Sequence, residues 1–255
     1  MGGILSQLFP PSPTFTEKEV PSLLGKVFIV TGGNAGVGLE LVKILYSKDA
    51  TVYIAARSPN RIAAEIEAVK ATYPTSQGNL KSLHLDLNDL ATVSKCVSTF
   101  LTQESRLDVL WNNAGISRAP IGSTSVQGHE AHMAVNCLGP FLLTKLLLPI
   151  LRTTAASIPE ASVRVVFASS GIIDMKGPPG GVSLAELAPG IHSTDIAYNY
   201  AASKAGNWLL ASEFHKRTRE DGIVAPWVMM AMMRPFMYEP KMGAYTELWA
   251  GLSPN

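Results

Sequence analysis

A glycine-rich turn between a strand-like run and a helix-like run is the feature that most constrains how this chain can fold. The segment KVFIVT at 26–31 is short and β-branched, and TGGNAGVG at 31–38 continues from its last residue. Between 39 and 45, apolar residues recur at the spacing of one helix face. A strand, a glycine turn and a helix in this order indicate the start of an α/β domain.

Strand-like and helix-like segments keep alternating after this unit. Six strands alternating with helices predict parallel pairing through right-handed crossovers. We therefore predict an α/β fold: a single-domain, Rossmann-like, doubly wound parallel sheet with helices on both faces. The later strands are expected at 51–56, 82–86, 107–112, 163–169 and 223–228, and the later helices at about 60–72, 90–101, 129–153 and 198–219.

Other parts of the chain differ from this alternating pattern. Residues 1–25 contain four prolines, and we expect an N-terminal arm that lies over the domain outside its core. The domain is predicted to span 26–255, with a shortened substrate or lid region at about 225–255. Irregular stretches at 113–128 and 171–197 each follow a strand, where ligands bind in open α/β sheets, so both are candidates for the substrate pocket.

Composition excludes several classes of function. The net charge is +1 without a block of lysine and arginine, so no nucleic-acid partner is expected. Two cysteines, Cys96 and Cys137, are too few for a disulfide framework and lack metal-ligand spacing, which indicates an intracellular protein with no metal site. Two prolines and a lysine interrupt the most apolar run, 138–151, and the first 20 residues lack a secretory signal pattern, so neither kind of membrane segment is predicted.

The glycine turn has the chemistry of a phosphate-binding loop. Gly32 allows a sharp exit from the strand, Gly36 lets a pyrophosphate approach the backbone, and Gly38 lets the helix pack closely. The helix N-terminus adds N–H groups and a positive dipole end. A turn that merely needs positive φ is the alternative. The predicted contacts to a dinucleotide in this loop are Thr31, Gly32, Asn34, Gly36, Val37 and Gly38.

The residues after the next strands indicate which dinucleotide is bound. A ribose 2′-hydroxyl favours a carboxylate at the end of the second strand, whereas a 2′-phosphate favours a cation. Arg57 stands there and can bind phosphate bidentately, so NADP(H) is favoured over NAD(H), unless Arg57 is simply a solvated charge. The other predicted cofactor contacts are Ser58 beside Arg57, Asp86 and Leu87 after the third strand, Asn113, Ala114 and Gly115 after the fourth, and Tyr200 and Lys204 on a later helix.

A tyrosine and a lysine on one helix face are candidate catalytic residues. Tyr200 and Lys204 are four residues apart on a predicted helix, although such a pair is common by chance. The pKa of a phenol must fall by about three units for acid–base work near neutrality, or about 4 kcal/mol, and a lysine cation about 4 Å away can supply that. Ser170, at the end of the fifth strand, could donate to a carbonyl oxygen. Asn136 is either a functional amide or a hydrogen-bonded core residue.

In this order, the motifs TGGNAGVG, AAR, HLDL, NNAG, VNCLGPFLLT, VVFASS and YAASK resemble the short-chain dehydrogenase/reductase family over about residues 25–224. The resemblance is to the TGxxxGxG/YxxxK subgroup and, within it, to the retinol-dehydrogenase-like branch that includes many fungal oxidoreductases. It implies a catalytic tetrad of Asn136, Ser170, Tyr200 and Lys204.

The resemblance also implies a role for each of these residues. Tyr200 would exchange the substrate proton, and Ser170, rather than Ser169, would polarise the carbonyl. Lys204 would hold the nicotinamide ribose and lower the pKa of Tyr200. Asn136 would anchor a water of the proton relay. Tyr200 is preferred to a nearby tyrosine at 198 because Lys stands four residues after it.

The long interval between Ser170 and Tyr200 bears on the substrate. It is similar to the corresponding interval of the retinol-dehydrogenase-like branch, and its Ile172, Ile173 and Met175 could line an apolar pocket. The substrate implied is a lipophilic ketone or secondary alcohol. A surface insertion without substrate contact is the open alternative.

The sequence departs from the family after the sixth predicted strand. Family members carry a Pro-Gly segment and a threonine that meets the nicotinamide amide, and this element is missing between 223 and 240. Six of the nine methionines lie at 229–242 instead, as a lid or, more simply, as core filling. The leading hypothesis is an NADP(H)-dependent carbonyl reductase or alcohol dehydrogenase. The alternatives are a catalytically impaired cofactor-binding protein and a non-redox isomerase or cyclase.

The N-terminus and the assembly give further expectations. Residues 1–6 fit the pattern for myristoylation of Gly2. The protein is expected to be cytoplasmic, and a single acyl chain would add only weak peripheral contact with an intracellular membrane. The expected partner is a lipophilic carbonyl or alcohol compound. A homo-oligomer formed through the helices at 129–153 and 198–219 is one option, and a monomer is the other.

Overall fold

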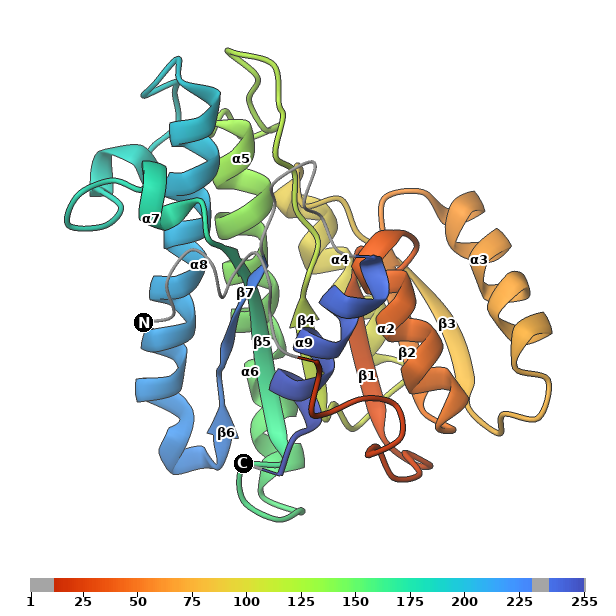
Figure 1. Cartoon of the computed structure of the whole chain (residues 1–255). Coiled ribbons are helices and arrows are strands. Elements are labelled where there is room, and N and C mark those ends of the chain that lie inside the picture. The colour runs from red at the N-terminus through yellow and green to blue at the C-terminus, as the bar shows by residue number, and fades with distance from the viewer. Residues whose placement is uncertain (1–11, 231–238, 255) are drawn as a thin grey trace.

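The structure, a computed structural model, describes residues 12–230 and 239–254. Figure 1 shows its strands as one sheet with helices on both sides. The elements in chain order are β1 (Val27–Thr31), α2 (Gly36–Ser47), β2 (Thr51–Ala56), α3 (Pro59–Thr72), β3 (Asn79–His84), α4 (Leu90–Leu101), β4 (Val109–Asn112), α5 (Ala131–Met133), η1 (Ala134–Leu138), α6 (Gly139–Ala155), β5 (Val163–Ser170), α7 (Ile173–Lys176), η2 (Leu184–Leu187), α8 (Ile196–Thr218), η3 (Arg219–Asp221), β6 (Ile223–Val224), β7 (Trp227–Met230) and α9 (Pro240–Leu252).

The sheet has the predicted doubly wound topology. Its strand order is β3-β2-β1-β4-β5-β6, with β7 also paired to β5, and each of these pairings is parallel. All residues of β1 and β5 are buried, as expected for parallel strands covered on both faces. The winding direction reverses between β1 and β4, so the carboxyl ends of these strands form the crevice where α/β proteins bind ligands.

Two hydrophobic layers cover the sheet. One contains Leu41 of α2, Ile62 of α3 and Leu248 of α9. The other contains Phe100 of α4 and Leu147 of α6, together with residues of α8. Figure 1 shows α9 in blue beside α2 in orange, so the last described helix shares a face with the first.

The end of the N-terminal arm is part of this packing, which differs from the expectation of an arm outside the core. Val20 and Leu23 are buried, and the Leu23 N–H donates to the Lys48 carbonyl at 2.6 Å. Nearer the start of the arm, Glu17 forms an ion pair with Lys241 of α9 at 2.9 Å. Apolar side chains at the end of the arm therefore extend the layer formed by α2 and α9. Residues 1–11, and with them the myristoylation pattern, lie outside the described residues.

Two predicted strands are placed differently in the structure. The strand expected at 223–228 is split into β6 and β7, because Pro226 between them has no N–H to donate to the sheet. Its carbonyl still accepts from the Phe167 N–H at 3.1 Å. The strand expected at 82–86 lies at Asn79–His84 instead.

The long helix expected at 129–153 is present as α5, η1 and α6, with a π-helical stretch at Ala134–Leu138. By length and composition, Ala131–Ala155 could cross a membrane, but 56% of its most apolar window is buried inside the fold. It packs here as a core helix of the α/β domain.

The carboxyl end of α9 is hydrogen-bonded to the start of β5. The buried Arg164 guanidinium donates to the Ala250 carbonyl at 2.9 Å and to the Ser253 carbonyl. These are carbonyl groups that a helix end leaves without a partner of its own. Burial lowers the pKa of Arg164.

Candidate active site

The glycine turn separates a packed glycine from an open one. A Cβ at Gly38 would lie 2.5 Å from Asn113 Nδ2 and 2.6 Å from the Gly32 carbonyl oxygen, so only hydrogen fits there. A Cβ at Gly36 would meet no atom of the described residues within 4 Å, and the φ of Gly36 is +55°. The backbone at Gly36 is therefore open to a ligand while Gly38 holds α2 against the turn.

The amino end of α2 has no side-chain cap. Its N-cap residue is Ala35, no side chain in the described part of the chain accepts from the first N–H groups, and the first turn carries no acidic residue. An uncapped helix end facing an open glycine backbone is a site for an anion such as a phosphate. The turn is held from the side: Asn113 Nδ2 donates to the Thr31 carbonyl at 2.8 Å, and the Ala114 N–H donates to Thr31 Oγ1 at 2.9 Å.

The predicted readers of the cofactor's adenosine half are arranged along the same edge. Arg57 is exposed directly after β2, and its side chain has no hydrogen bond or ion pair with the residues that the structure describes. Ser58 caps α3 by accepting from the Arg61 N–H, which leaves its own hydroxyl hydrogen free to donate. Asp86 accepts from the Asn88 N–H at 3.0 Å. Leu87 is buried, so its side chain belongs to the core.

The four predicted catalytic residues come together from three elements. Ser170 is the last residue of β5, Tyr200 and Lys204 lie on α8, and Asn136 lies in η1. All four are buried, and Ser170 is close enough to Tyr200 to lower its pKa. The Lys204 ammonium donates to the Ala168 carbonyl at 2.9 Å and lies 6.0 Å from the centroid of the Tyr200 ring.

Gly115 is the close neighbour that these residues share. A Cβ at Gly115 would lie 3.0 Å from Asn136 Oδ1 and 3.3 Å from Lys204 Nζ. The structure thus brings Asn136 and Lys204 to the same small residue at the end of β4. A larger residue at 115 would crowd the amide and the ammonium.

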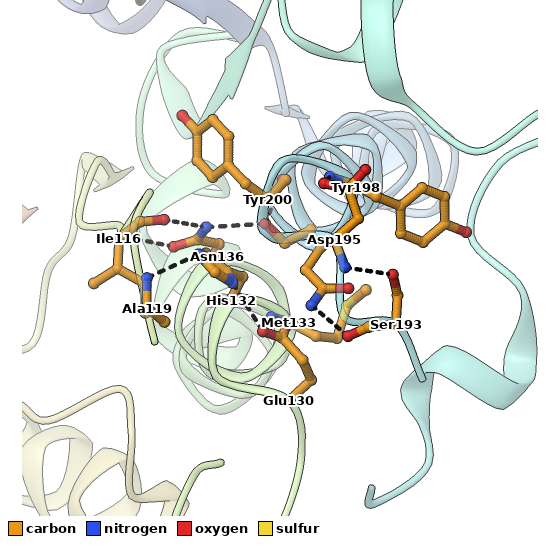
Figure 2. A network of polar contacts seen from close by, with 12 residues as sticks. Ile116, Ala119, Glu130, His132, Met133, Asn136, Ser193, Asp195, Tyr198 and Tyr200 are labelled. Atoms are coloured by element: carbon orange, nitrogen blue, oxygen red, sulfur yellow. Dashed lines mark hydrogen bonds and ion pairs between the residues drawn. The ribbon is translucent and has the colours of Figure 1, made fainter. Parts of the chain in front are cut away.

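The Asn136 amide is fully engaged within the protein, as Figure 2 shows. Its Oδ1 accepts from the Ile116 N–H at 2.8 Å, and its Nδ2 donates to the Ile116 carbonyl and to Ser203 Oγ, each at 2.9 Å. Asn136 therefore ties the loop after β4 to α8. The structure thus shows the hydrogen-bonded buried residue that was one of the two alternatives left by the sequence, and a functional role of the amide stays a prediction.

The electrostatics of Tyr200 differ from the expectation that Lys204 lowers its pKa. Burial raises the pKa of Tyr200 and the hydrogen bond with Ser170 lowers it, with a net rise above 10.0. The physical reason is that the Lys204 ammonium points to the Ala168 carbonyl. Burial also lowers the pKa of Lys204 to about 8, although the charges of Glu247 and Cys137 act in the opposite direction.

Sequence reasoning missed a carboxyl group near this lysine. Glu247 of α9 is fully buried, and neither of its carboxyl oxygens has a hydrogen-bond partner among the described residues. Burial raises the pKa of Glu247 to about 8, opposed by the charge of Lys204. No local pattern marks it, because one glutamate in an apolar helix is ordinarily on the solvent side.

Two other polar residues next to Lys204 could have been found from helical spacing. Ser203 and Asn207 lie within one turn of Lys204, and both are buried. Asn207 Nδ2 donates to the same Ala168 carbonyl as Lys204, at 2.9 Å. Four polar residues on one face of a buried helix would have predicted a hydrogen-bonded cluster rather than an isolated pair.

The structure also distinguishes the rejected neighbours of the candidate residues. Ser169 Oγ donates to the Lys204 carbonyl at 3.0 Å and so is a structural contact. The Tyr198 hydroxyl donates to Glu186 at 2.6 Å, and Figure 2 shows Tyr198 and Tyr200 pointing in different directions.

The two irregular stretches expected to form the pocket are joined directly. The Gly190 N–H donates to the Gly128 carbonyl at 2.9 Å. Ile172 and Ile173 are half-buried, whereas Met175 is 54% exposed. In the methionine-rich region, Met242 is half-buried. Residues 231–238 lie outside the described residues, and they belong to the stretch 223–240 where the Pro-Gly-threonine element is missing.

A doubly wound parallel sheet with an open glycine turn at its switch point places the protein among the Rossmann-like nucleotide-binding proteins. The sequence profile of the family described as short chain dehydrogenase matches residues 26–185, and the chain belongs to this family. The family is one of oxidoreductases that bind a nicotinamide cofactor.

Individual proteins agree with this assignment. The chain is 45% identical to short-chain dehydrogenase/reductase iacJ of Pestalotiopsis fici, over 98% of this chain and 82% of that protein. A metagenomic short-chain oxidoreductase solved in complex with NADP has the same fold, with a TM-score of 0.70, 23% identity and coverage of 91% of this chain and 93% of its own. So does an NADH-dependent reductase, with a TM-score of 0.71, 22% identity and 90% of each chain covered.

Proposed function

We propose that the protein is an NADP(H)-dependent carbonyl reductase or alcohol dehydrogenase acting on a lipophilic ketone or secondary alcohol. The observation that carries the proposal is the meeting of Ser170, Tyr200, Lys204 and Asn136 at the carboxyl edge of β4 and β5. This group lies at the same edge of the sheet as the open turn at Gly36.

The residues present fit a nicotinamide dinucleotide. The open backbone at Gly36 and the uncapped end of α2 would hold the pyrophosphate, and Lys204 would hold the nicotinamide ribose. When bound, the reduced cofactor supplies the hydride that adds to the carbonyl carbon.

The protein's own residues would handle the proton. The Ser170 hydroxyl would donate a hydrogen bond to the carbonyl oxygen, which becomes more negative as the bond order falls. Because the pKa of Tyr200 is raised, its phenol is protonated at neutral pH and can give that proton to the oxygen. In the direction of carbonyl reduction, Tyr200 would therefore be the proton donor.

The choice of NADP(H) rests on Arg57. An exposed guanidinium with no intramolecular partner in the described chain is free to bind a 2′-phosphate bidentately. Titration with NADPH and NADH should show tighter binding of NADPH. Arg57→Ala should weaken NADPH binding about tenfold or more and leave NADH binding nearly unchanged, because one charge-assisted contact is worth about 1.5–3 kcal/mol. The matched control is Arg61→Ala, an exposed arginine one turn into α3; equal losses in the two variants would refute the assignment.

Turnover tests the catalytic assignment. Tyr200→Phe should abolish carbonyl reduction and leave NADPH binding largely intact, because it removes the proton donor and no cofactor-phosphate contact. Tyr198→Phe is the matched control, and it should retain activity because that hydroxyl is bound to Glu186. Undiminished turnover by Tyr200→Phe would contradict the proposal.

A cofactor-binding protein without turnover is the second candidate function. The alignment with the Pestalotiopsis relative spans 270 positions against 255 residues here, so that relative carries residues that this chain lacks. The missing Pro-Gly-threonine element is consistent with such a loss. NADPH binding without turnover on a panel of ketones and aldehydes would favour this candidate.

A further inference from the structure

A buried glutamate and histidine lie one turn before Asn136 and belong to none of the roles described so far. Glu130 is the N-cap of α5: its Oε2 accepts from the Met133 N–H at 2.8 Å. Its Oε1 lies 2.8 Å from His132 Nδ1. The side chains are 9% and 1% exposed, so both are held away from solvent.

The hydrogen bonds fix which nitrogen of His132 carries the proton. His132 Nε2 lies 3.2 Å from the Ala119 backbone nitrogen, and a backbone N–H can only donate. Nε2 is therefore the acceptor and Nδ1–H donates to Glu130. Burial raises the pKa of Glu130, but the hydrogen bonds from His132 and the Met133 N–H outweigh it and lower the pKa overall, so Glu130 is a carboxylate.

The His132 imidazole thereby connects a loop of the candidate pocket to α8, the helix that carries Tyr200. His132 and Asn136 are four residues apart, and Figure 2 shows both binding the segment after β4, His132 at Ala119 and Asn136 at Ile116. The His132 ring also packs edge-on against Tyr200, with the ring centroids 6.2 Å apart at 63°. One side chain thus contacts a pocket loop and the phenol that delivers the proton.

We propose that His132, oriented by Glu130, is a positioning residue that holds the segment 116–119 and the Tyr200 ring in their reactive arrangement. The role rests on the proposed function. His132 is not a proton donor to the substrate, since both ring nitrogens are already used. It acts through geometry, and errors of about 1 Å in such geometry can cost about 100-fold in rate.

Two substitutions at His132 separate its hydrogen bond from its bulk. His132→Phe keeps a ring against Tyr200 and removes both hydrogen bonds, whereas His132→Gln keeps an acceptor near the position of Nε2. His129→Phe is the control, because the His129 ring makes no hydrogen bond to the rest of the described chain. If His132→Phe does not fold, Glu130→Gln removes the orienting carboxylate, and the same measurements should change in the same direction by less.

The first measurement needs no activity: amide hydrogen exchange of Ala119 in the cofactor-free protein. His132→Phe should speed this exchange about tenfold or more, while His132→Gln and His129→Phe should stay within about threefold of the parent. The second is kinetics with NADPH and a ketone substrate. His132→Phe should lower kcat about 10- to 100-fold with an unchanged KM for NADPH, and His132→Gln should restore most of kcat.

The outcomes distinguish this inference from the proposed function. Faster exchange in His132→Phe with unchanged kcat, or a lower melting temperature alone, would reduce His132 to a core residue and overturn the inference. Unchanged exchange in the folded variant would overturn it too. If the parent protein itself shows no turnover, the proposed function fails. In that case unchanged Ala119 exchange in His132→Phe overturns the inference that His132 holds the segment 116–119, and faster exchange supports it.

Discussion

Replacing Glu247 by glutamine should stabilise the protein, with a gain that grows between pH 5 and pH 8. The Glu247 carboxyl is fully buried on α9 without a hydrogen-bond partner in the described chain, and burial raises its pKa from 4.5 to about 8. A carboxyl with a raised folded-state pKa leaves stability intact below pH 4.5. Stability then falls as the pH rises toward 8, because the unfolded chain ionises more readily.

The pKa shift gives the size of the effect. At pH 7 the folded carboxyl is still protonated, whereas in the unfolded chain it is ionised, because pH 7 lies about 2.5 units above the ordinary pKa of 4.5. At about 1.36 kcal/mol per unit, this difference lowers the free energy of unfolding by about 3 kcal/mol. At pH 5 the same reasoning gives less than about 1 kcal/mol. Glutamine keeps the shape without ionising, but its amide also lacks partners. We therefore expect a net gain of about 1–2 kcal/mol at pH 7, or about 3–6 °C in Tm.

The assay is thermal unfolding of parent and Glu247→Gln at pH 5, 6, 7 and 8. Glu239→Gln is the control, since Glu239 is the exposed N-cap residue of the same helix and makes no capping hydrogen bond. Because the Glu239 side chain is exposed, Glu239→Gln should change Tm little. A difference for Glu247→Gln that is constant between pH 5 and 8, or that shrinks as the pH rises, would show that the carboxyl is not buried as described.

Three further substitutions test the turn and the end of the last helix. Gly38→Ala should cost about 1–3 kcal/mol in unfolding free energy, because its Cβ would lie 2.5 Å from Asn113 Nδ2; urea denaturation measures this. Gly36→Ala should cost only about 1 kcal/mol, from its φ of +55°, but should weaken NADPH binding more than it weakens the fold. Arg164→Met should lower the unfolding free energy by about 2–4 kcal/mol, since it removes donors from the carboxyl end of α9; an unchanged midpoint would mean that these bonds contribute nothing net.

The fold and the meeting of the four candidate residues could be predicted because their signals are local. Strands β1, β2 and β5 are runs rich in β-branched residues, and the doubly wound arrangement follows from alternation and crossover handedness. Tyr200 and Lys204 share a helix face by spacing alone, and Ser170 ends a strand that winding brings beside them. These are consequences of period and chain order, which a sequence displays directly.

The rest depends on contacts between distant segments. The burial of Val20 in the core layer, the full engagement of the Asn136 amide and the raised pKa of Tyr200 each arise from partners far along the chain. Glu247 is the extreme case, because its environment is set by the packing of α9 against the sheet and α2. Local patterns report which face of an element is apolar, not what will cover it.

Both ends of strand β5 contact other parts of the fold through their side chains. Arg164, near its start, holds the last helix, and Ser170, at its end, meets Tyr200. A slip of β5 by one pleat would release the helix and withdraw the hydroxyl together, so the strand cannot yield at one end alone. On slow heating, the proposed reductase activity should therefore be lost together with the folded chain, and no inactive but still folded form should accumulate.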